Sequence, residues 1–136
     1  MDKRDLILVV DFGGVYTQLV ARRIREARVY CEVVPYTVAV EEIREKRPKG
    51  LVLSGDLFSV HDESSLWCDP AVLQGIPVLG IGGGMQLLAQ MMGGKVSRGE
   101  KRECKAVQLT LLRHDLIFKG LKQMRKTNWK MRKRII

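Results

Sequence analysis

Apolar residues gather in short continuous runs that polar stretches separate. The runs occupy residues 5–12, 29–35, 50–55 and 76–81. Continuous aliphatic and β-branched runs are typical of strands in a parallel sheet that is covered on both faces. Residues 16–27 and 40–46 have instead the spacing of amphipathic helices. Because strands alternate with helices, we predict a three-layer α/β domain with a mainly parallel sheet.

The predicted helices supply the rest of the core. In residues 16–27 the apolar positions recur at helical spacing, and we expect this face to be buried: Tyr16, Leu19, Val20, Ile24 and Ala27. Arginines fill the other face, where we expect solvent. A third helix is predicted over residues 85–92, and we interpret its apolar side chains as core: Met85, Leu87, Leu88, Met91 and Met92.

The junction between the last strand and the third helix reads "VLGIGGGMQLLAQ". A strand that turns sharply through small residues into a helix is how many α/β enzymes raise a nucleophile above the sheet, on a nucleophile elbow. Here the turn consists of glycines, so it carries no side chain. Three loops follow strands, at residues 11–15, 54–59 and 80–84, and parallel strands bring such loops to one edge. We expect any site to lie at that edge.

Charge is uneven along the chain. The net charge is +9, yet eight basic residues and no acidic ones follow Leu116, so the remainder is close to neutral. We predict a domain at residues 1–120 and a basic C-terminal tail at residues 121–136. Such a tail could bind nucleic acid through phosphate contacts, with Trp129 available for stacking. Charge runs are more often solvated, and we favour that interpretation.

The sequence gives no sign of a disulfide framework, a zinc site, a membrane span or a signal peptide. Cys31, Cys68 and Cys104 are too widely spaced to indicate a disulfide framework or a zinc site, and Cys31 is interpreted as a core thiol. We predict no metal and no cofactor. No apolar run approaches the roughly 18 residues of a membrane span, and the N-terminus lacks the pattern of a signal peptide. We therefore expect no membrane contact and a cytoplasmic location.

Several segments together resemble one enzyme family. They read "VVDFGGVYTQLVARRIRE", "VYCEVVPYT", "EEIREKRPKGLVLSG", "GMQLLAQMMGG" and "GGKVSRGEKRE". They are similar to the class I (triad-type) glutamine amidotransferase domain of GMP synthases, over residues 6–120. The resemblance implies a flavodoxin-like, class I amidotransferase fold, and we expect this chain to be a C-terminally truncated form of it.

The resemblance also implies where the reaction would occur. The family's elbow pattern is G-[IV]-C-x-G-x-Q, whose cysteine attacks the amide of glutamine. Gly80, Ile81, Gly84 and Gln86 match that pattern, but Gly82 stands where the cysteine would be. Glycine cannot act as a covalent nucleophile. The residues implied for substrate binding are Gly55, Asp56, Gly83, Gly84 and Gln86.

Other parts of the implied machinery differ as well. The family's oxyanion loop reads S-G-G-P, whereas this chain has Asp56 in place of the second glycine and Leu57 in place of the proline. A carboxylate there would oppose the charge of a developing oxyanion. Val15 stands where the family commonly has glutamine.

The family's base and its orienting acid, an H-x-E pair, would lie beyond the end of this chain. Neither histidine, His61 or His114, provides that pair: "HDE" at residues 61–63 precedes the elbow, in the wrong chain order.

We therefore predict a catalytically inactive amidotransferase-like domain that acts as a scaffold or an interaction module. Two alternatives stay open: residual binding of glutamine or an anion at the glycine turn, and nucleic-acid binding by the basic tail. Strands missing from a truncated sheet would leave an open edge, which invites pairing with a second chain. We accordingly expect a homodimer through that edge, or a protein partner.

Overall fold

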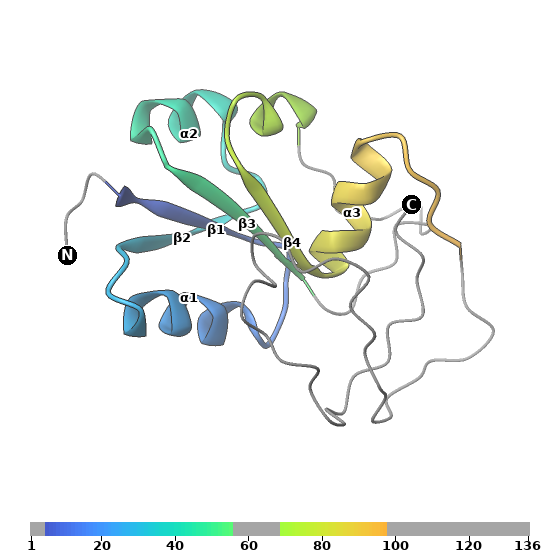
Figure 1. Cartoon of the computed structure of the whole chain (residues 1–136). Helices are drawn as coiled ribbons and strands as arrows, with labels where there is room; N and C mark the ends of the chain where they lie inside the picture. The colour runs from blue at the N-terminus through green and yellow to red at the C-terminus, as the bar shows by residue number, and fades with distance from the viewer. Residues whose placement is uncertain (1–4, 56–68, 98–136) are drawn as a thin grey trace, which may run out of the picture. The chain divides into compact units, whose positions relative to one another are not determined.

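The computed structural model describes residues 5–55 and 69–97, all within the unit Met1–Arg98. Four parallel strands form one sheet in the order β2-β1-β3-β4 (Figure 1). The strands are β1 (Ile7–Asp11), β2 (Cys31–Pro35), β3 (Gly50–Gly55) and β4 (Val78–Gly82). The helices are α1 (Thr17–Glu26), α2 (Val40–Lys46), the 3-10 helix η2 (Pro70–Leu73) and α3 (Gly83–Met91). The four predicted strands and three predicted helices are confirmed.

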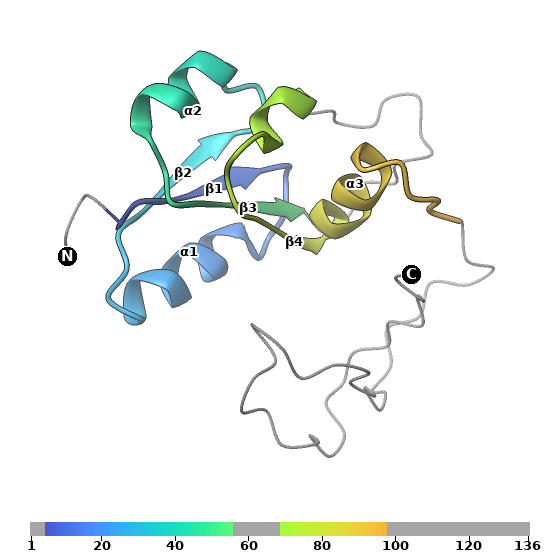
Figure 2. The same ribbon diagram turned by 45° about the horizontal axis from the view of Figure 1, so that its top comes forward.

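Helices lie on both faces of the sheet. Figures 1 and 2 show α1 below the sheet, and α2 and η2 above it. The chain crosses from β1 to β2 through α1, then passes over β1 to reach β3 through α2. This reversal places a topological switch point at the carboxyl ends of β1 and β3, where open α/β sheets bind ligands. The predicted three-layer α/β architecture with a parallel sheet is confirmed.

The main core lies between the sheet and the layer of α2, η2 and α3. Its fully buried side chains include Leu8, Leu51, Leu53, Ile43 and Leu87. All six residues of β3 are buried, because β3 has strands on both sides and helices on both faces. This double burial is the physical reason that β3 reads as a continuous apolar run rather than an alternating one. Cys31 is buried, as predicted.

The predicted buried face of α1 is partly wrong. Thr17 and Ala21 face the sheet, whereas Tyr16 and Leu19 are 48% and 44% exposed and Ala27 is exposed. Small side chains let the helix lie close to the strands, and the hydroxyl of Thr17 finds partners there. Leu19 follows Thr17 by two residues, which is about 200° around a helix, and so lies on the outer side.

The third helix also departs from its prediction. α3 begins at Gly83, two residues before the predicted start. The prediction began after the glycines because glycine has a low helix propensity. Leu87 is fully buried, but Met92 is 77% exposed, since it follows the last helical residue and lies past the edge of the core.

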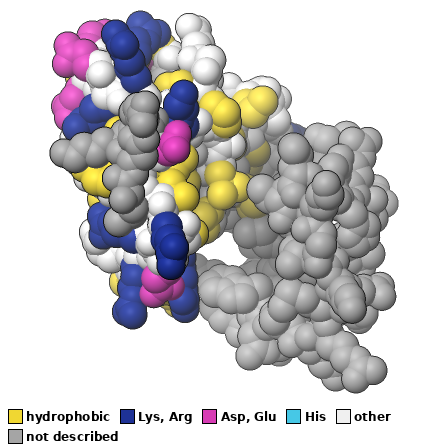
Figure 3. All heavy atoms as spheres, turned by 60° about the vertical axis from the view of Figure 1, so that its left-hand side comes forward, with side chains coloured by type: hydrophobic (Ala, Val, Ile, Leu, Met, Phe, Trp, Pro, Cys, Tyr) yellow, Lys and Arg dark blue, Asp and Glu magenta, His cyan; other side chains and the backbone are white. Residues whose placement is uncertain are grey.

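Charged side chains cover the outer sides of the helices. In Figure 3 many of them lie at the top and bottom of the view, and most of the hydrophobic side chains in view lie between these two groups. On α1, Glu26 accepts from Arg22 at 3.0 Å and from Arg23 at 2.7 Å. The hydrogen bonds from Arg23 and Arg22 lower the pKa of Glu26. The expectation of a solvated arginine face is confirmed for α1.

Two strands, β2 and β4, form the edges of the described sheet, and the predicted pairing edge concerns β4. β4 pairs with β3 on one side and with no other strand among residues 5–55 and 69–97. Leu79 and Ile81 are 41% and 36% exposed. They alternate with Val78 and Gly80, the partners of the core residues Leu51 and Leu53, so they lie on the face of the sheet that carries α1. The expected homodimer through this edge stays a prediction.

Several expectations fall outside the described residues. They concern Asp56, the "HDE" stretch, Cys68, Cys104 and the division of the chain at residue 120 with its basic tail. Within the described part, no helix is long and apolar enough to cross a membrane.

Candidate functional site

The turn from β4 into α3 has the backbone of a nucleophile elbow. Gly82, the last residue of β4, has φ 61° and ψ −125°. Residues with side chains rarely adopt a positive φ of this kind, and elbow turns hold their central residue in such strain. Gly82 adopts it without strain because it has no Cβ. The sharp turn therefore exists, and its central residue presents only backbone.

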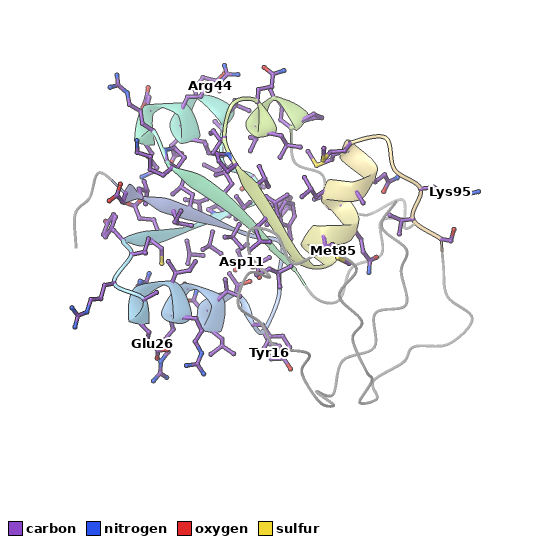
Figure 4. All side chains as sticks on the ribbon, in the orientation of Figure 1. Asp11, Tyr16, Glu26, Arg44, Met85 and Lys95 are labelled. Carbon is purple, nitrogen blue, oxygen red and sulfur yellow. The ribbon has the colours of Figure 1, made fainter. Side chains whose placement is uncertain are left out.

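Two neighbouring glycines make this turn sterically feasible. A Cβ on Gly80 would lie 2.5 Å from the Cα of Met85, and a Cβ on Gly84 would overlap the carbonyl oxygen of Leu53. The strand and the helix approach so closely that neither position has room for a methyl group. Figure 4 shows Met85 on the first turn of α3, beside the end of β4. The spacing of these glycines around Gly82 follows from the packing of α3 against β3 and β4.

The structure brings most of the predicted site residues together. Gly55 ends β3 and is the Cα partner of Gly82 in the parallel pairing of β3 with β4. Gly83 and Gly84 begin α3 and are buried, and Gln86 lies one turn further along, half-buried. Asp56, the remaining predicted residue, follows Gly55 directly but lies outside the described residues.

Beside this turn lies a hydrogen-bonded cluster that the motifs in the sequence did not reveal. Oδ1 of Asp11 accepts from the backbone N–H of Gly13 at 2.8 Å and of Gly14 at 3.4 Å. The same oxygen accepts from the hydroxyl of Thr17 at 3.0 Å. Figure 4 shows Asp11 at the carboxyl end of the sheet, on the side of α1. The carboxylate thus holds the loop between β1 and α1 in place.

The cluster extends to β3 through Thr17. Its hydroxyl oxygen lies 3.1 Å from the hydroxyl oxygen of Ser54, and both residues are almost fully buried. Thr17 has one hydroxyl hydrogen, which Asp11 must receive because a carboxylate only accepts. The hydroxyl of Ser54 therefore donates to Thr17, and the hydrogen bonds run from Ser54 through Thr17 to Asp11.

A signal for this cluster was present in the sequence. Asp11 ends an apolar strand and precedes two glycines, a combination typical of a side chain that caps a turn. Thr17 gives a weaker signal, because hydrophobic periodicity ranks it below Tyr16 and Leu19. The burial of Thr17 makes sense only once both of its hydrogen-bond partners are located.

The described part of the site contains no nucleophilic side chain at the elbow. Cys31 begins β2 and pairs with Ile7 at the amino end of β1, whereas Gly82 lies beside Gly55 at the carboxyl end of β3. The thiol of Cys31 lies 3.3 Å from the carbonyl oxygen of Ala21, between the sheet and α1. Gly82, the N-cap residue of α3, makes no side-chain capping hydrogen bond. No group of metal-ligating side chains occurs in the described ranges.

Comparisons with known proteins find a matching family model and similar GMP synthases. A family model described as "Glutamine amidotransferase class-I" matches residues 8–131. The GMP synthase (glutamine-hydrolysing) of Acetivibrio thermocellus is 48% identical over 120 residues, which are 88% of this chain and 24% of that protein. The corresponding protein of Heliobacterium modesticaldum is 49% identical over 118 residues, 86% of this chain and 23% of that protein. The chain thus spans about a quarter of the length of these relatives.

A solved structure shows the same architecture. The crystal structure of a protein described as a GMP synthase subunit, from Thermoplasma acidophilum, superposes with a TM-score of 0.74 at 25% sequence identity. The superposition covers 92% of this chain and 63% of that one.

Proposed function

The chain belongs to the class I glutamine amidotransferase family, and we propose that it is a non-hydrolysing member related to the amidotransferase domain of GMP synthases. Its role is that of a scaffold or interaction module rather than an ammonia source. The observation that carries the proposal is the backbone of Gly82: the residue at the turning point of the elbow has the positive φ of such a turn and no side chain.

The chemistry of the family explains why this single position matters. The family's reaction proceeds through a cysteine thiolate that attacks the amide carbon of glutamine and expels ammonia. Without an atom beyond Cα at residue 82, no thioester forms there. Cys31 cannot substitute, because it is buried at the opposite end of the strands.

Covalent capture tests the proposal. A chloroketone analogue of glutamine alkylates a thiolate that lies in a glutamine pocket, and glutamine protects such a thiolate. Digestion and mass mapping of the treated chain should find no glutamine-protected adduct. An adduct on Cys68 or Cys104 that glutamine prevents, and that the matching Cys68→Ser or Cys104→Ser variant loses, would overturn the proposal.

A second candidate function is glutamine binding without hydrolysis. It is favoured by the adjacency of Gly55 and Gly82, which keeps the backbone of the implied pocket in one place. Amide nitrogen–proton NMR spectra with and without glutamine distinguish the two. Shifts confined to Gly55 and Gly82–Gln86 would indicate a glutamine sensor, whereas an unchanged spectrum leaves the scaffold role.

A further inference from the structure

The hydrogen bonds that run from Ser54 through Thr17 to Asp11 link side chains of three neighbouring elements. Asp11 ends β1, Thr17 begins α1 and Ser54 precedes the last residue of β3. Thr17 and Ser54 are 1% and 2% exposed, and they are the two buried polar side chains of the described residues. Buried hydroxyls are costly unless they are paired, so the pairing has to hold in the folded state.

Ser54 is fixed at three points. Its side chain donates to Thr17, its carbonyl oxygen accepts from the backbone N–H of Phe12 at 2.9 Å, and it pairs with Ile81 of β4. The next residue is Gly55, which lies opposite Gly82. Any movement of Ser54 along the strand direction is therefore transmitted to Gly55, the described residue that pairs with Gly82.

From these contacts we infer that Thr17 is a positioning residue for the elbow site. It holds Gly55 in register with Gly82 by linking Ser54 to the carboxylate of Asp11. The inference rests on the proposed function only in taking the Gly55–Gly82 pair as the site, and it does not depend on whether the site hydrolyses glutamine. A glycine beside a glycine adds no side-chain packing, so at this pair the register depends on the backbone pairing of β3 with β4 and on contacts made by neighbours such as Ser54.

Amide hydrogen exchange on the whole chain tests the inference. Thr17→Val keeps the shape of the side chain but removes the hydroxyl, and leaves Ser54 and Asp11 without that partner. Loss of such a bond should speed exchange at Gly55 and Gly82 by roughly tenfold more than at core amides such as Leu8 and Ile43. Thr17→Ser keeps the hydroxyl and should restore the wild-type ratio.

The comparison with core amides separates positioning from general stability. A purely structural Thr17 would speed exchange at all four amides by the same factor, and that outcome would overturn the inference. So would a failure of Thr17→Ser to restore the ratio. Should Thr17→Val fail to fold, Ser54→Ala removes the hydroxyl at the other end of this series of hydrogen bonds. It should produce the same local rise in exchange at Gly55 and Gly82.

The experiment uses no glutamine, so its outcome is independent of catalysis. Ammonia release from wild-type protein would refute the proposed function and leave this inference standing. Exchange that rises by the same factor at all four amides would refute this inference and leave the proposed function standing.

Discussion

Gly55, the last residue of β3, lies directly opposite Gly82, the residue at which β4 turns into α3. β3 and β4 therefore end side by side, each with a glycine that presents only backbone atoms at the carboxyl edge of the sheet. This is where an α/β enzyme of this family would hold its nucleophile and the backbone that stabilises an oxyanion. Within the described residues, Gly55 and Gly82 supply backbone at this place, and Gly82 carries no reactive side chain.

The positive φ of Gly82 predicts a cost for any side chain there. Gly82→Ala should lower the free energy of unfolding by about 1–3 kcal/mol, because a Cβ is strained at φ 61°. Urea denaturation measures the change. Gly75→Ala is the reference variant: Gly75 has a positive φ of 75° and nothing within 4 Å of an added Cβ, so its loss of stability reports the φ strain alone and should be of similar size. A Gly82→Ala protein as stable as wild type would contradict the elbow conformation.

The flanking glycines should be still less tolerant. Gly84→Ala would place a methyl group on the carbonyl oxygen of Leu53, and Gly80→Ala would place one 2.5 Å from the Cα of Met85. Both neighbours are backbone and cannot rotate away, so each substitution should cost about 3 kcal/mol or more. Thermal unfolding of the two variants checks this. Losses no larger than that of Gly75→Ala would show that α3 does not pack this closely on β3.

Much of this fold could be predicted because the core strands are buried on both faces. Continuous apolar runs such as residues 5–12 and 50–55 are typical of strands that are covered on both faces, and the observed bounds of β3 are the predicted ones. The site was less predictable. Glycine spacing identified the elbow, but the roles of Thr17 and Ser54 depend on a contact between residues 37 positions apart. Hydrophobic periodicity also placed Tyr16 and Leu19 inside, because it does not register that a buried threonine can replace an apolar residue when its hydroxyl is paired.

A second polar cluster, on β2, predicts a pH dependence of stability. Oε1 of Glu32 accepts from the hydroxyl of Tyr30 at 3.0 Å, and Oε2 accepts from Nζ of Lys46 at 2.8 Å. The hydrogen bond to Glu32 raises the pKa of Tyr30 above 10.0 and that of Lys46 above 10.5. Both groups bind their protons more tightly in the folded state.

The stability that Tyr30 and Lys46 contribute is therefore fully present below their ordinary pKa values. It is lost as the pH rises through their raised pKa values in the folded state. Glu32→Gln removes the carboxylate that raises both pKa values. Melting temperatures recorded from about pH 9 upward should fall more steeply for wild type than for Glu32→Gln. Parallel curves for the two proteins would show that Glu32 does not couple to either group.

The C-terminal end of α2 offers a stabilising substitution. Arg47 caps this helix with φ 47°, a left-handed conformation that favours glycine. Arg47→Gly should raise the free energy of unfolding by about 0.5–1 kcal/mol. Arg44→Gly, in the last turn of the same helix, is the matched control and should instead lower it by about 1 kcal/mol. Denaturant titration of both variants checks the sign, and a loss of stability in Arg47→Gly would show that its side chain makes a compensating contact.

Ammonia release from glutamine tests the central claim most directly. The wild-type chain, incubated with glutamine and followed by a coupled ammonia assay, should release ammonia at the rate of a protein-free control. Prior alkylation of its thiols should change nothing. Release that saturates with glutamine and disappears on alkylation would show that one of the three cysteines serves as the nucleophile, and would contradict the assignment of this chain as a non-hydrolysing amidotransferase domain.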